Sequence, residues 1–512
     1  MDRRFKAQRT SISQRLAWLG IVLWISSAPL PAAQNAALTP AQTSPALIAG
    51  PALDVKAVED LIAERIQAGD LVGVSLAVAR DGTIVLSRGF GRDRIDDNRP
   101  VTPETMFAVG SVTKQFTAAC VLLLAEDGKM AVTDKAARYY PDLTRASDIT
   151  ILDLLNHVSG YPDYYPLDFV DRRMAKPMAV DDVIRAYAKN ALDFEPGSRY
   201  SYSNTGFLIL GRIVERVSGE PFGTFLSRRI LKPLGLDHTI YEPDPQGPAF
   251  AVGHTTFGLS APQPAIPEGK GWIAMAGALY STASDLVRWD LALIGGKVLR
   301  PESLKLMTTR RRLSDGSLSS YACGLGVGER NGVIVLNHNG AVSGFYAYNL
   351  VVPSNGSALA VLINFEAGGQ VGKINRLIVP SLFPPVPPVK PAPAAAKSAL
   401  PAAPEKSGVP AIAGLPAIDA TRVLFLALQS GAIDRTELGG EFNWFLTSEK
   451  IKGASARLKP FGAPTAVTVT SIGERGGMEV STAELKFAKG TLQTLMYRTP
   501  DGKVQQFFVS KN

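Results

Sequence analysis

Hydrophobic and polar positions change their period along the chain, and these changes predict its first elements. Val55–Gln67 carries apolar residues at the spacing of an amphipathic helix, whereas Val72–Arg80 alternates apolar and polar residues as a strand does. Asp81-Gly82 follows, and Asp-Gly between two alternating runs is a signal for a β-hairpin. We therefore predict a second strand that runs from Thr83 towards Gly91.

The middle of the chain, from about Thr102 to Gly296, shows mainly helical periodicity and loops that contain Gly and Pro. Strand patterns return near Tyr321. The strands and turns predicted there are Gly324–Gly328, a turn at Asn331-Gly332, Val333–Leu336, Tyr346–Val352, a turn at Asn355-Gly356 and Ala358–Asn364. Strands on either side of a helical middle find partners only if they meet in one antiparallel sheet. We expect an α+β fold over residues 53–379.

A stretch rich in Pro and Ala, 380–416, is typical of an extended linker and ends this domain. Residues 417–512 then predict a small α+β module. Its expected elements are two helical stretches, Thr421–Gln429 and Arg435–Ser448, and strands at Ala466–Thr470, Met478–Phe487, Leu492–Arg498 and Val504–Val509. The module has no recognisable catalytic constellation, and its partner is unknown. We hypothesise that it docks the enzyme or binds a ligand, with Phe442, Trp444, Phe445, Tyr497, Phe507 and Phe508 in its core.

The N-terminus has the layout of a secretory signal peptide. Basic residues precede an apolar run, Leu16–Ile25, which is followed by small residues and prolines. This run holds about ten residues, whereas a membrane-spanning helix needs about 20. We predict a signal peptide over residues 1–33 and a disordered spacer over 34–52, and hence export to the periplasm or the medium.

Charge and composition exclude some classes of function. The formal net charge is +8, and +4 of it precedes the first apolar run. Clustered Lys and Arg with interleaved aromatic residues are lacking, which argues against a nucleic-acid partner. The two cysteines, Cys120 and Cys323, lie in apolar segments and are expected to be buried and reduced. The four histidines are dispersed, so we predict no metal site and no cofactor.

Ser111 and Lys114 form the first candidate for chemistry. They lie three residues apart at the start of a predicted buried helix, so their side chains share one face. A serine hydroxyl needs a neighbour to accept its proton, and a lysine can do so once burial lowers its pKa. Alone, this pattern is weak, because a capping serine beside a solvated lysine gives the same spacing.

Two further motifs follow in the order expected of one site. Tyr202-Ser203-Asn204 precedes an apolar helix; Tyr202 supplies a phenol for proton transfer, and Asn204 can hold a substrate amide and bond Lys114. His338-Asn339-Gly340 ends a predicted strand, where Gly340 lets a substrate backbone lie close. The backbone N–H groups of Ala341 and Ser111 would form an oxyanion hole.

These three motifs together resemble the superfamily of serine β-lactamases and penicillin-binding proteins, in particular its class C-like branch. Stretches such as 154–160, 232–236 and 276–286 extend the resemblance over roughly Val55–Phe365. It implies an antiparallel sheet flanked by helices, a mostly helical domain facing it, and a cleft between them. It further implies an acyl-enzyme on Ser111, a proton relay through Lys114 and Tyr202, and a structural His157.

The chain departs from the pattern of the family at one position. In β-lactamases and many D,D-peptidases the third motif begins with a lysine that attracts the substrate carboxylate, and here that position is His338. The version with histidine resembles the branch that contains esterases, D-amino-acid peptidases and amidases. This resemblance implies an ester, amide or small peptide substrate, including a D-amino-acid peptide or a cell-wall fragment. The alternatives are β-lactamase activity and a relative that binds peptidoglycan or peptides without hydrolysis.

Overall fold

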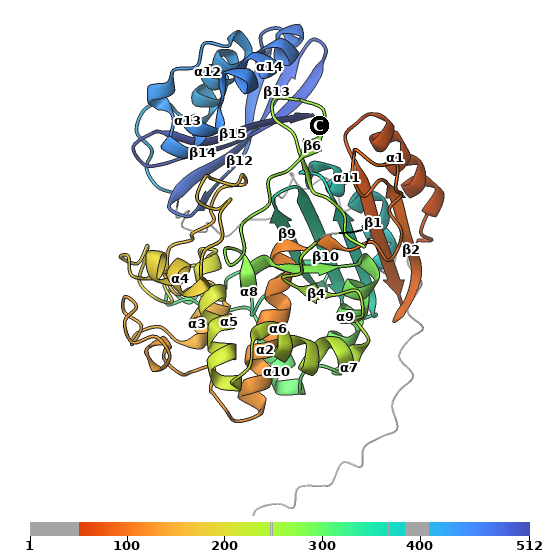
Figure 1. Cartoon of the computed structure of the whole chain (residues 1–512), viewed down its shortest axis with the longest axis vertical. Helices are drawn as coiled ribbons and strands as arrows, with labels where there is room; N and C mark the ends of the chain where they lie inside the picture. Colours follow the sequence, from red (N-terminus) through yellow and green to blue (C-terminus); the bar gives the residue numbers. More distant parts are fainter. Residues whose placement is uncertain (1–50, 246, 248, 367, 384–408, 512) are drawn as a thin grey trace, which may run out of the picture. The chain divides into compact units, whose positions relative to one another are not determined.

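An antiparallel sheet of six strands organises the larger part of the molecule, in the order β2-β1-β11-β10-β9-β8. Strands β2, β1, β10 and β9 of this sheet are labelled in Figure 1. The computed structural model describes residues 51–245, 247, 249–366, 368–383 and 409–511. The sheet strands are β1 Gly73–Arg80, β2 Thr83–Gly91, β8 Gly326–Arg330, β9 Val333–Val342, β10 Phe345–Val352 and β11 Ser357–Ile363. Strands from the beginning and the end of the larger domain thus share one sheet, as predicted, because β1 pairs with β11.

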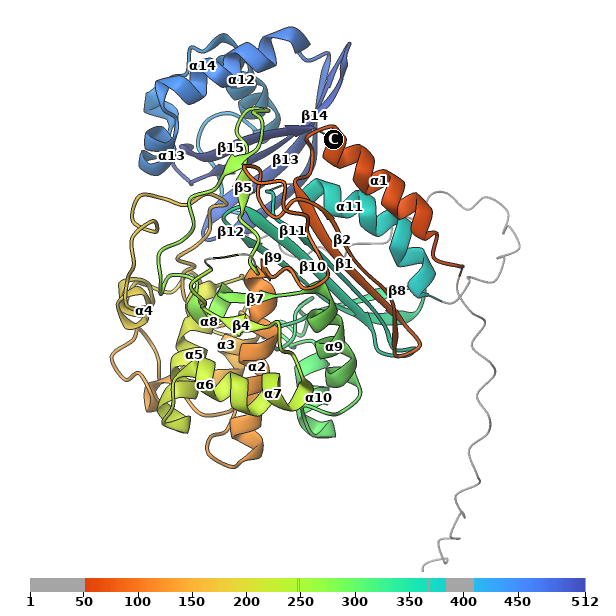
Figure 2. The same ribbon diagram turned by 45° about the vertical axis from the view of Figure 1, so that its right-hand side comes forward.

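Alternation along the central strands explains how both faces of the sheet are buried. In β1, Leu76 and Val78 face one apolar cluster, whereas Ala77 and Ala79 face the other. The first cluster lies beneath α1, Val55–Gln67, and α11, Gly368–Ile378, which cover the same face side by side (Figure 2). The small alanines of the second face let the central helices pack closely against the sheet.

The second face carries the helical part of the domain, as predicted. Its helices and single turns are η1 Gly110–Val112, α2 Thr113–Glu126, η2 Ala136–Arg138, α3 Ile151–Leu155, α4 Val180–Ala188, α5 Asn204–Ser218, α6 Phe222–Leu226, η3 Ser227–Leu231, α7 Lys232–Leu234, α8 Ala274–Gly277, α9 Ala283–Ile294 and α10 Pro301–Thr308. Short strands join them: β3 Phe107–Ala108, β4 Ile240–Tyr241, β5 His254–Thr255, β6 Gln263–Pro264 and β7 Leu279–Ser281.

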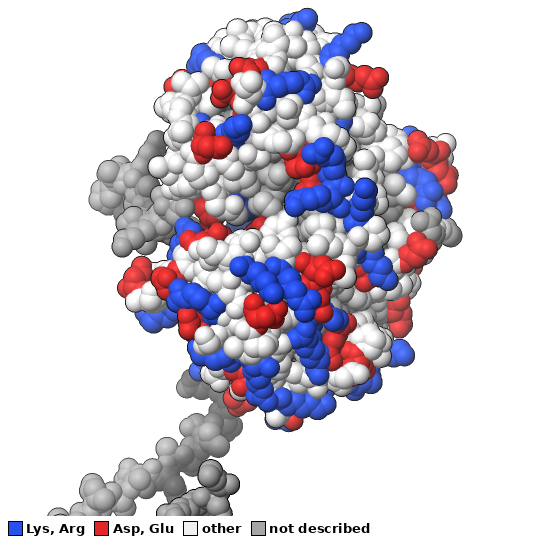
Figure 3. Space-filling view, turned by 60° about the vertical axis from the view of Figure 1, so that its left-hand side comes forward, with Lys and Arg blue, Asp and Glu red and all other residues white. Residues whose placement is uncertain are grey.

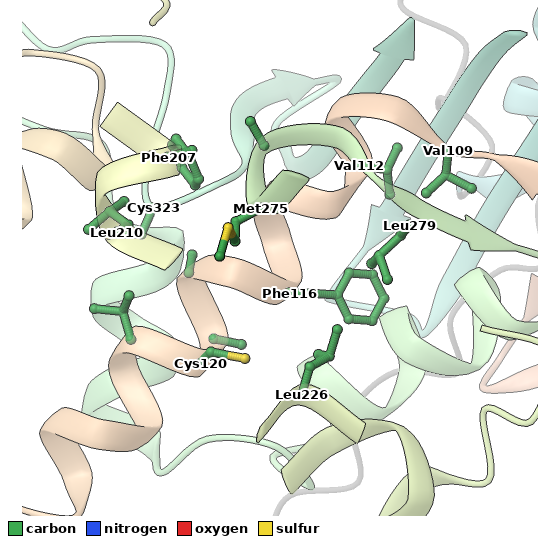
Figure 4. Packing of buried hydrophobic residues seen from close by; sticks show 14 of the residues in the cluster. Val109, Val112, Phe116, Cys120, Phe207, Leu210, Leu226, Met275, Leu279 and Cys323 are labelled. Atoms are coloured by element: carbon green, nitrogen blue, oxygen red, sulfur yellow. The ribbon is translucent and has the colours of Figure 1, made fainter. Parts of the chain in front are cut away.

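Helix α2 is the centre of the helical part. Val112, Phe116 and Cys120 point into an apolar cluster that also receives Phe207 of α5 and Met275 of α8 (Figure 4). Every residue of α2 from Thr113 to Leu124 is buried, so the helix is held from all sides. The element that begins beside the predicted nucleophile is therefore fixed by packing.

The C-terminal module has its own four-stranded antiparallel sheet, in the order β12-β13-β14-β15. Its elements are α12 Ala417–Ser430, η5 Arg435–Glu437, α13 Gly440–Phe445, α14 Ser448–Leu458, η6 Lys459–Phe461, β12 Ala466–Arg475, β13 Met478–Phe487, β14 Gly490–Arg498 and β15 Val504–Lys511. Phe442, Tyr497 and Phe507 are buried as expected, whereas the expectation was wrong for Trp444, which is exposed beneath the guanidinium of Arg172.

The described residues of both parts form one compact unit. Phe169 and Phe257, from loops of the first part, complete the apolar cluster of the C-terminal module. Arg457 of α14 donates hydrogen bonds to the carbonyl groups of Phe257 and Gly258. The module is therefore seated on the larger domain by both apolar and polar contacts.

Some expectations fall on residues that the structure leaves undescribed. The predicted signal peptide and nearly all of the spacer lie outside the described residues, as does most of the predicted linker. The first residues assigned to that linker belong to η4, Val379–Leu382, and Leu382 and Phe383 are buried. The first domain thus continues a few residues past the predicted boundary at 379, because these side chains add to its core.

Three further observations concern the cysteines, membrane-spanning helices and the charges on the surface. Cys120 and Cys323 are both free and buried, which confirms the expectation. Among the described residues, no helix has the length and apolar character needed to cross a bilayer. On the face shown in Figure 3, Lys and Arg side chains are interspersed with Asp and Glu.

Candidate active site

Ser111 lies at the junction between strand β3 and helix α2. The sequence predicts it in the first helical turn; the structure places it in the 3₁₀ turn η1, directly before α2. Lys114 follows in the first turn of α2, and its Nζ lies 3.1 Å from Ser111 Oγ. The predicted spacing therefore does bring the hydroxyl and the amine within hydrogen-bonding distance.

The amine of Lys114 is fully buried, and its surroundings define its protonation state. Nζ donates hydrogen bonds to Asn204 Oδ1 and to the carbonyl oxygen of Ala276, each at 2.7 Å. Burial lowers the pKa of Lys114 well below 10.5, Asp163 opposes this shift, and Arg475 adds to it. A neutral amine has two N–H groups and one lone pair, so these two acceptors leave the lone pair for the Ser111 hydroxyl.

Tyr202 lies next to this pair. Lys114 Nζ is 4.9 Å from the centre of its ring. Burial raises the pKa of Tyr202, and the nearby Ser111 hydroxyl offsets part of that rise. The phenol is therefore protonated at neutral pH. Its oxygen is buried, lacks a well-formed hydrogen bond to the described residues, and lies near the Ser111 hydroxyl.

Asn204 begins helix α5 and is oriented by a carboxylate that the sequence reasoning missed. Asp163 accepts hydrogen bonds from the backbone N and from Nδ2 of Asn204, each at 3.0 Å. This turns Oδ1 of Asn204 towards Lys114. Asp163 lies 41 residues from Asn204 in the chain, in a loop rich in Tyr and Pro, and no recognisable spacing joins the two.

His338 lies within strand β9, with both ring nitrogens engaged. Nδ1 is 2.6 Å from the carbonyl oxygen of Asn339, which can only accept, so Nδ1 carries the proton. Nε2 then accepts a hydrogen bond from the hydroxyl of Tyr321 at 2.8 Å. Burial, and after it Lys114, lower the pKa of His338 to about 3. The imidazole is neutral at physiological pH and offers no charge to a carboxylate.

Gly340 brings strand β9 close to the nucleophile. A Cβ at this position would lie 1.9 Å from the carbonyl oxygen of Val109 and 3.2 Å from the backbone N of Ser111. The residue therefore makes room for the chain's own backbone before Ser111, whereas the sequence reasoning assigned that room to the substrate. Ala341, the next residue, is exposed, and a Cβ on Gly110 would lie 2.8 Å from its backbone N.

His157 has a structural role in this geometry, as the resemblance implies. Its Nδ1 accepts a hydrogen bond from the backbone N of Ser203 at 3.1 Å. Its ring lies 4.3 Å from the ring of Tyr202, between centroids. Burial lowers the pKa of His157, so the ring is neutral. It holds the loop that carries Tyr202.

A small pocket opens at Ser111. Of the predicted site residues, Ser111, Asn204 and Ala341 line it, whereas Lys114, Tyr202, His338 and Gly340 are not among its lining residues. The remaining lining residues are Tyr164, Tyr165, Ile273, Ala276, Gly277, Val342 and Arg475. Within the described ranges, no group of three His, Cys, Asp or Glu residues is arranged to hold a metal ion.

Comparison with known proteins shows the family to which the chain belongs. The Beta-lactamase family profile matches residues 58–380. The candidate penicillin-binding protein PbpX of Bacillus subtilis (strain 168) is 29% identical over 305 residues, which are 59% of this chain and 73% of PbpX. The D-amino acid amidase of Ochrobactrum anthropi SV3, solved with L-phenylalanine amide, is 24% identical with a TM-score of 0.54, over 63% of this chain and 97% of the amidase.

A third comparison also covers the C-terminal module. The octameric penicillin-binding protein homologue of Pyrococcus abyssi is 19% identical with a TM-score of 0.57, over 89% of this chain and 95% of that protein. At this identity the likeness concerns the fold alone. The profile match spans more than half of the chain and includes the three motifs. It supports serine hydrolase activity in general, and the chain belongs to the β-lactamase family.

Proposed function

We propose that this chain is a serine hydrolase that forms an acyl-enzyme on Ser111 and acts on esters, amides or small peptides. The observation that carries the proposal is the position of Lys114: its buried amine lies 3.1 Å from Ser111 Oγ, while two acceptors take up its N–H groups. A binding protein has no physical need for such a base beside a hydroxyl.

Acylation would begin with Lys114 as the base. Ser111 Oγ attacks the substrate carbonyl carbon as its proton passes to the neutral amine of Lys114. The negative charge that develops on the carbonyl oxygen meets the backbone N–H groups of Ser111 and Ala341. The bond to the leaving group then breaks, and the leaving group takes the proton of the Tyr202 hydroxyl, which Lys114 replaces. Tyr202 is thus a relay, because its raised pKa keeps it protonated at rest.

Deacylation reverses the same path with water. Water adds to the acyl carbon and gives up a proton through the Tyr202 and Lys114 pair, and the ester bond to Ser111 Oγ breaks as the serine regains its proton. No step calls for a group beyond the residues named. Asn204 would act mainly by holding Lys114, because its own amide is bonded to Asp163.

The substrate class is inferred from the third motif and from a structural neighbour. The neutral His338 gives a β-lactam carboxylate no positive partner at the third motif, where β-lactamases and many D,D-peptidases carry a lysine. The likeness to D-amino acid amidase supports a small amide.

The test is turnover and intact mass with p-nitrophenyl esters, D-amino-acid amides and nitrocefin, each with wild type and Ser111→Ala. We expect an acyl adduct and ester or amide turnover, both abolished by the substitution. Fastest turnover of nitrocefin would overturn the substrate class. Absence of any adduct, also with a fluorophosphonate, would leave the peptide-binding alternative.

Export is a second part of the proposal. It rests on the basic and apolar N-terminal stretch of the sequence. Fractionation of expressing cells, followed by determination of the mature N-terminus, tests it. An uncleaved protein confined to the cytoplasm would refute it.

A further inference from the structure

The first hairpin of the C-terminal module reaches the loops around the active site. Its turn, Gly476-Gly477, joins β12 to β13, and both glycines have positive φ. A Cβ on Gly476 would lie 2.6 Å from Cβ of Pro166 in the first domain. Glu474, just before the turn, accepts a hydrogen bond from Ser201 Oγ at 3.1 Å, one residue before Tyr202. The hairpin tip is therefore part of the surroundings of the site.

Arg475 extends from this tip into the pocket at Ser111. Its Nη1 donates to Asp168 Oδ1 at 3.0 Å and to the hydroxyl of Tyr497 at 3.2 Å. Its Nη2 donates to the carbonyl oxygen of Tyr165 at 3.0 Å. These bonds engage Nη1 and Nη2, and 26% of the side-chain surface stays exposed. The side chain is thus held in place with part of its surface exposed.

The residues that hold Arg475 in place come from both parts of the chain. Gln506 of β15 bonds Asp168 twice: Oε1 accepts from the backbone N at 2.7 Å, and Nε2 donates to Oδ2 at 2.8 Å. Phe169, the next residue, is buried in the apolar cluster of the module. These contacts fix the partner of the guanidinium before any substrate arrives, which favours binding because little freedom is left to lose.

Arg475 is also the one lysine or arginine among the described residues that line this pocket. The neutral His338 supplies no charge at the third motif, and burial lowers the pKa of Lys114. Nearby Tyr497, Asp168 and Asp163 raise the pKa of Arg475 despite its burial, so it remains charged. A permanent cation thus enters the pocket from the C-terminal module.

We propose that Arg475 is a specificity-determining residue that binds a carboxylate of the substrate, from the hairpin of the C-terminal module. This rests on the proposed hydrolysis at Ser111. Arg475 takes the place of the positive charge that His338 does not supply, and substrates with a carboxylate beside the reacting bond are preferred over neutral ones of the same shape. Asp168 shares the guanidinium and so limits this preference.

Two matched substrate pairs test the proposal. One pair is p-nitrophenyl hydrogen glutarate and p-nitrophenyl methyl glutarate, with the charge in the acyl group. The other is N-acetyl-D-alanyl-D-alanine and its C-terminal amide, with the charge in the leaving group. We measure kcat/KM for each member with the full chain, and take the ratio of the charged to the neutral substrate.

In at least one pair, Arg475→Met should lower this ratio about 10- to 100-fold, because loss of a hydrogen bond to a charged group usually has an effect of this size. Arg475→Lys should restore part of it, since a point charge lacks the planar fork. Asp168→Asn should raise the ratio, because it removes the competing carboxylate. Arg422→Met, at an exposed site on α12 of the same module, is the matched control and should leave the ratio unchanged.

An equal effect of Arg475→Met on both members of both pairs would overturn the proposal, because that is the result of a purely structural role. The proposed function would survive it, provided that Ser111 still forms an adduct. If wild type forms no adduct on Ser111, the hydrolase itself is refuted. If Arg475→Met is unstable, the Asp168→Asn ratio decides, and an unchanged ratio there counts against the carboxylate site.

Discussion

Replacing Gly340 by alanine should separate strand β9 from the nucleophile. The added Cβ would lie 1.9 Å from the carbonyl oxygen of Val109, and real contacts of this kind stay above about 3.0 Å. Strand β9 and the segment at Val109 must therefore move apart by roughly 1 Å. A misplacement of about 1 Å between reacting groups can cost on the order of 100-fold in rate. The overpacking should also lower the free energy of unfolding by about 1–3 kcal/mol.

The assay is the rate of Ser111 acylation by a p-nitrophenyl ester, together with thermal unfolding. Gly328→Ala in the neighbouring strand β8 is the matched control, since a Cβ there meets nothing within 4 Å. We expect Gly340→Ala to acylate about 100-fold more slowly than this control. If the two variants acylate within about twofold of each other and unfold at the same temperature, the close approach of β9 does not position the site.

Three further predictions concern protons and thiols. Asp163→Asn removes a charge that raises the pKa of Lys114. Activity is lost as pH falls through that pKa, so the acid limb of the kcat/KM profile should move to lower pH. An unchanged acid limb in the pH–rate profile would contradict this. Tyr202→Phe should slow acylation about 10²- to 10⁴-fold in stopped-flow assays, with no loss of thermal stability because the hydroxyl lacks a well-formed hydrogen bond to the described residues; marked destabilisation would refute this. Burial raises the pKa of the Cys120 and Cys323 thiols, so a chromogenic disulfide reagent should label neither in the native protein and both in denaturant; rapid native labelling would show that the thiols are accessible.

Much of the fold follows from local patterns in the sequence. The helix Val55–Gln67 and the strand Thr83–Gly91 have the predicted bounds, because an Asp N-cap and an Asp-Gly turn mark their ends. Two helices were missed. The helix α11 begins with two glycines and is stabilised by packing on the sheet, and α14 starts where the predicted stretch Arg435–Ser448 ends. The N-cap of α14, Thr447, accepts a hydrogen bond from the backbone N of Lys450 and is a local signal that the prediction did not use.

Strand β9 shows how pairing overrides turn-like composition. The sequence predicts a strand over Val333–Leu336, with the motif His338-Asn339-Gly340 at its end. The structure continues it to Val342, since residues 336–342 pair with β10. This extension places His338 in the sheet and Gly340 beside the nucleophile. The motif residues could be found from the sequence, but their surroundings depend on this longer strand.

The residues of the site also differ in how far the sequence predicts that they lie together. Ser111 and Lys114 are close in sequence, so a helical spacing is enough to bring them together. Asp163 and Arg475 come together with them only through tertiary contacts, and neither belongs to a recognisable motif. The Pro/Ala-rich stretch before the C-terminal module suggests separation, whereas the module is seated on the first domain and adds Arg475 to the pocket.

Arg475 links the two parts in a second way, which bears on how its substitution is interpreted. Its charge lowers the pKa of Lys114, so its removal should raise that pKa and leave less neutral base at a given pH. This loss falls equally on every substrate, because the base is common to all of them. A carboxylate contact affects only the charged substrate. The ratio between matched substrates therefore cancels the effect on the base, and a pH profile with the neutral ester alone measures it. The C-terminal module would then contribute both to the state of the catalytic amine and to the choice of substrate, through one side chain.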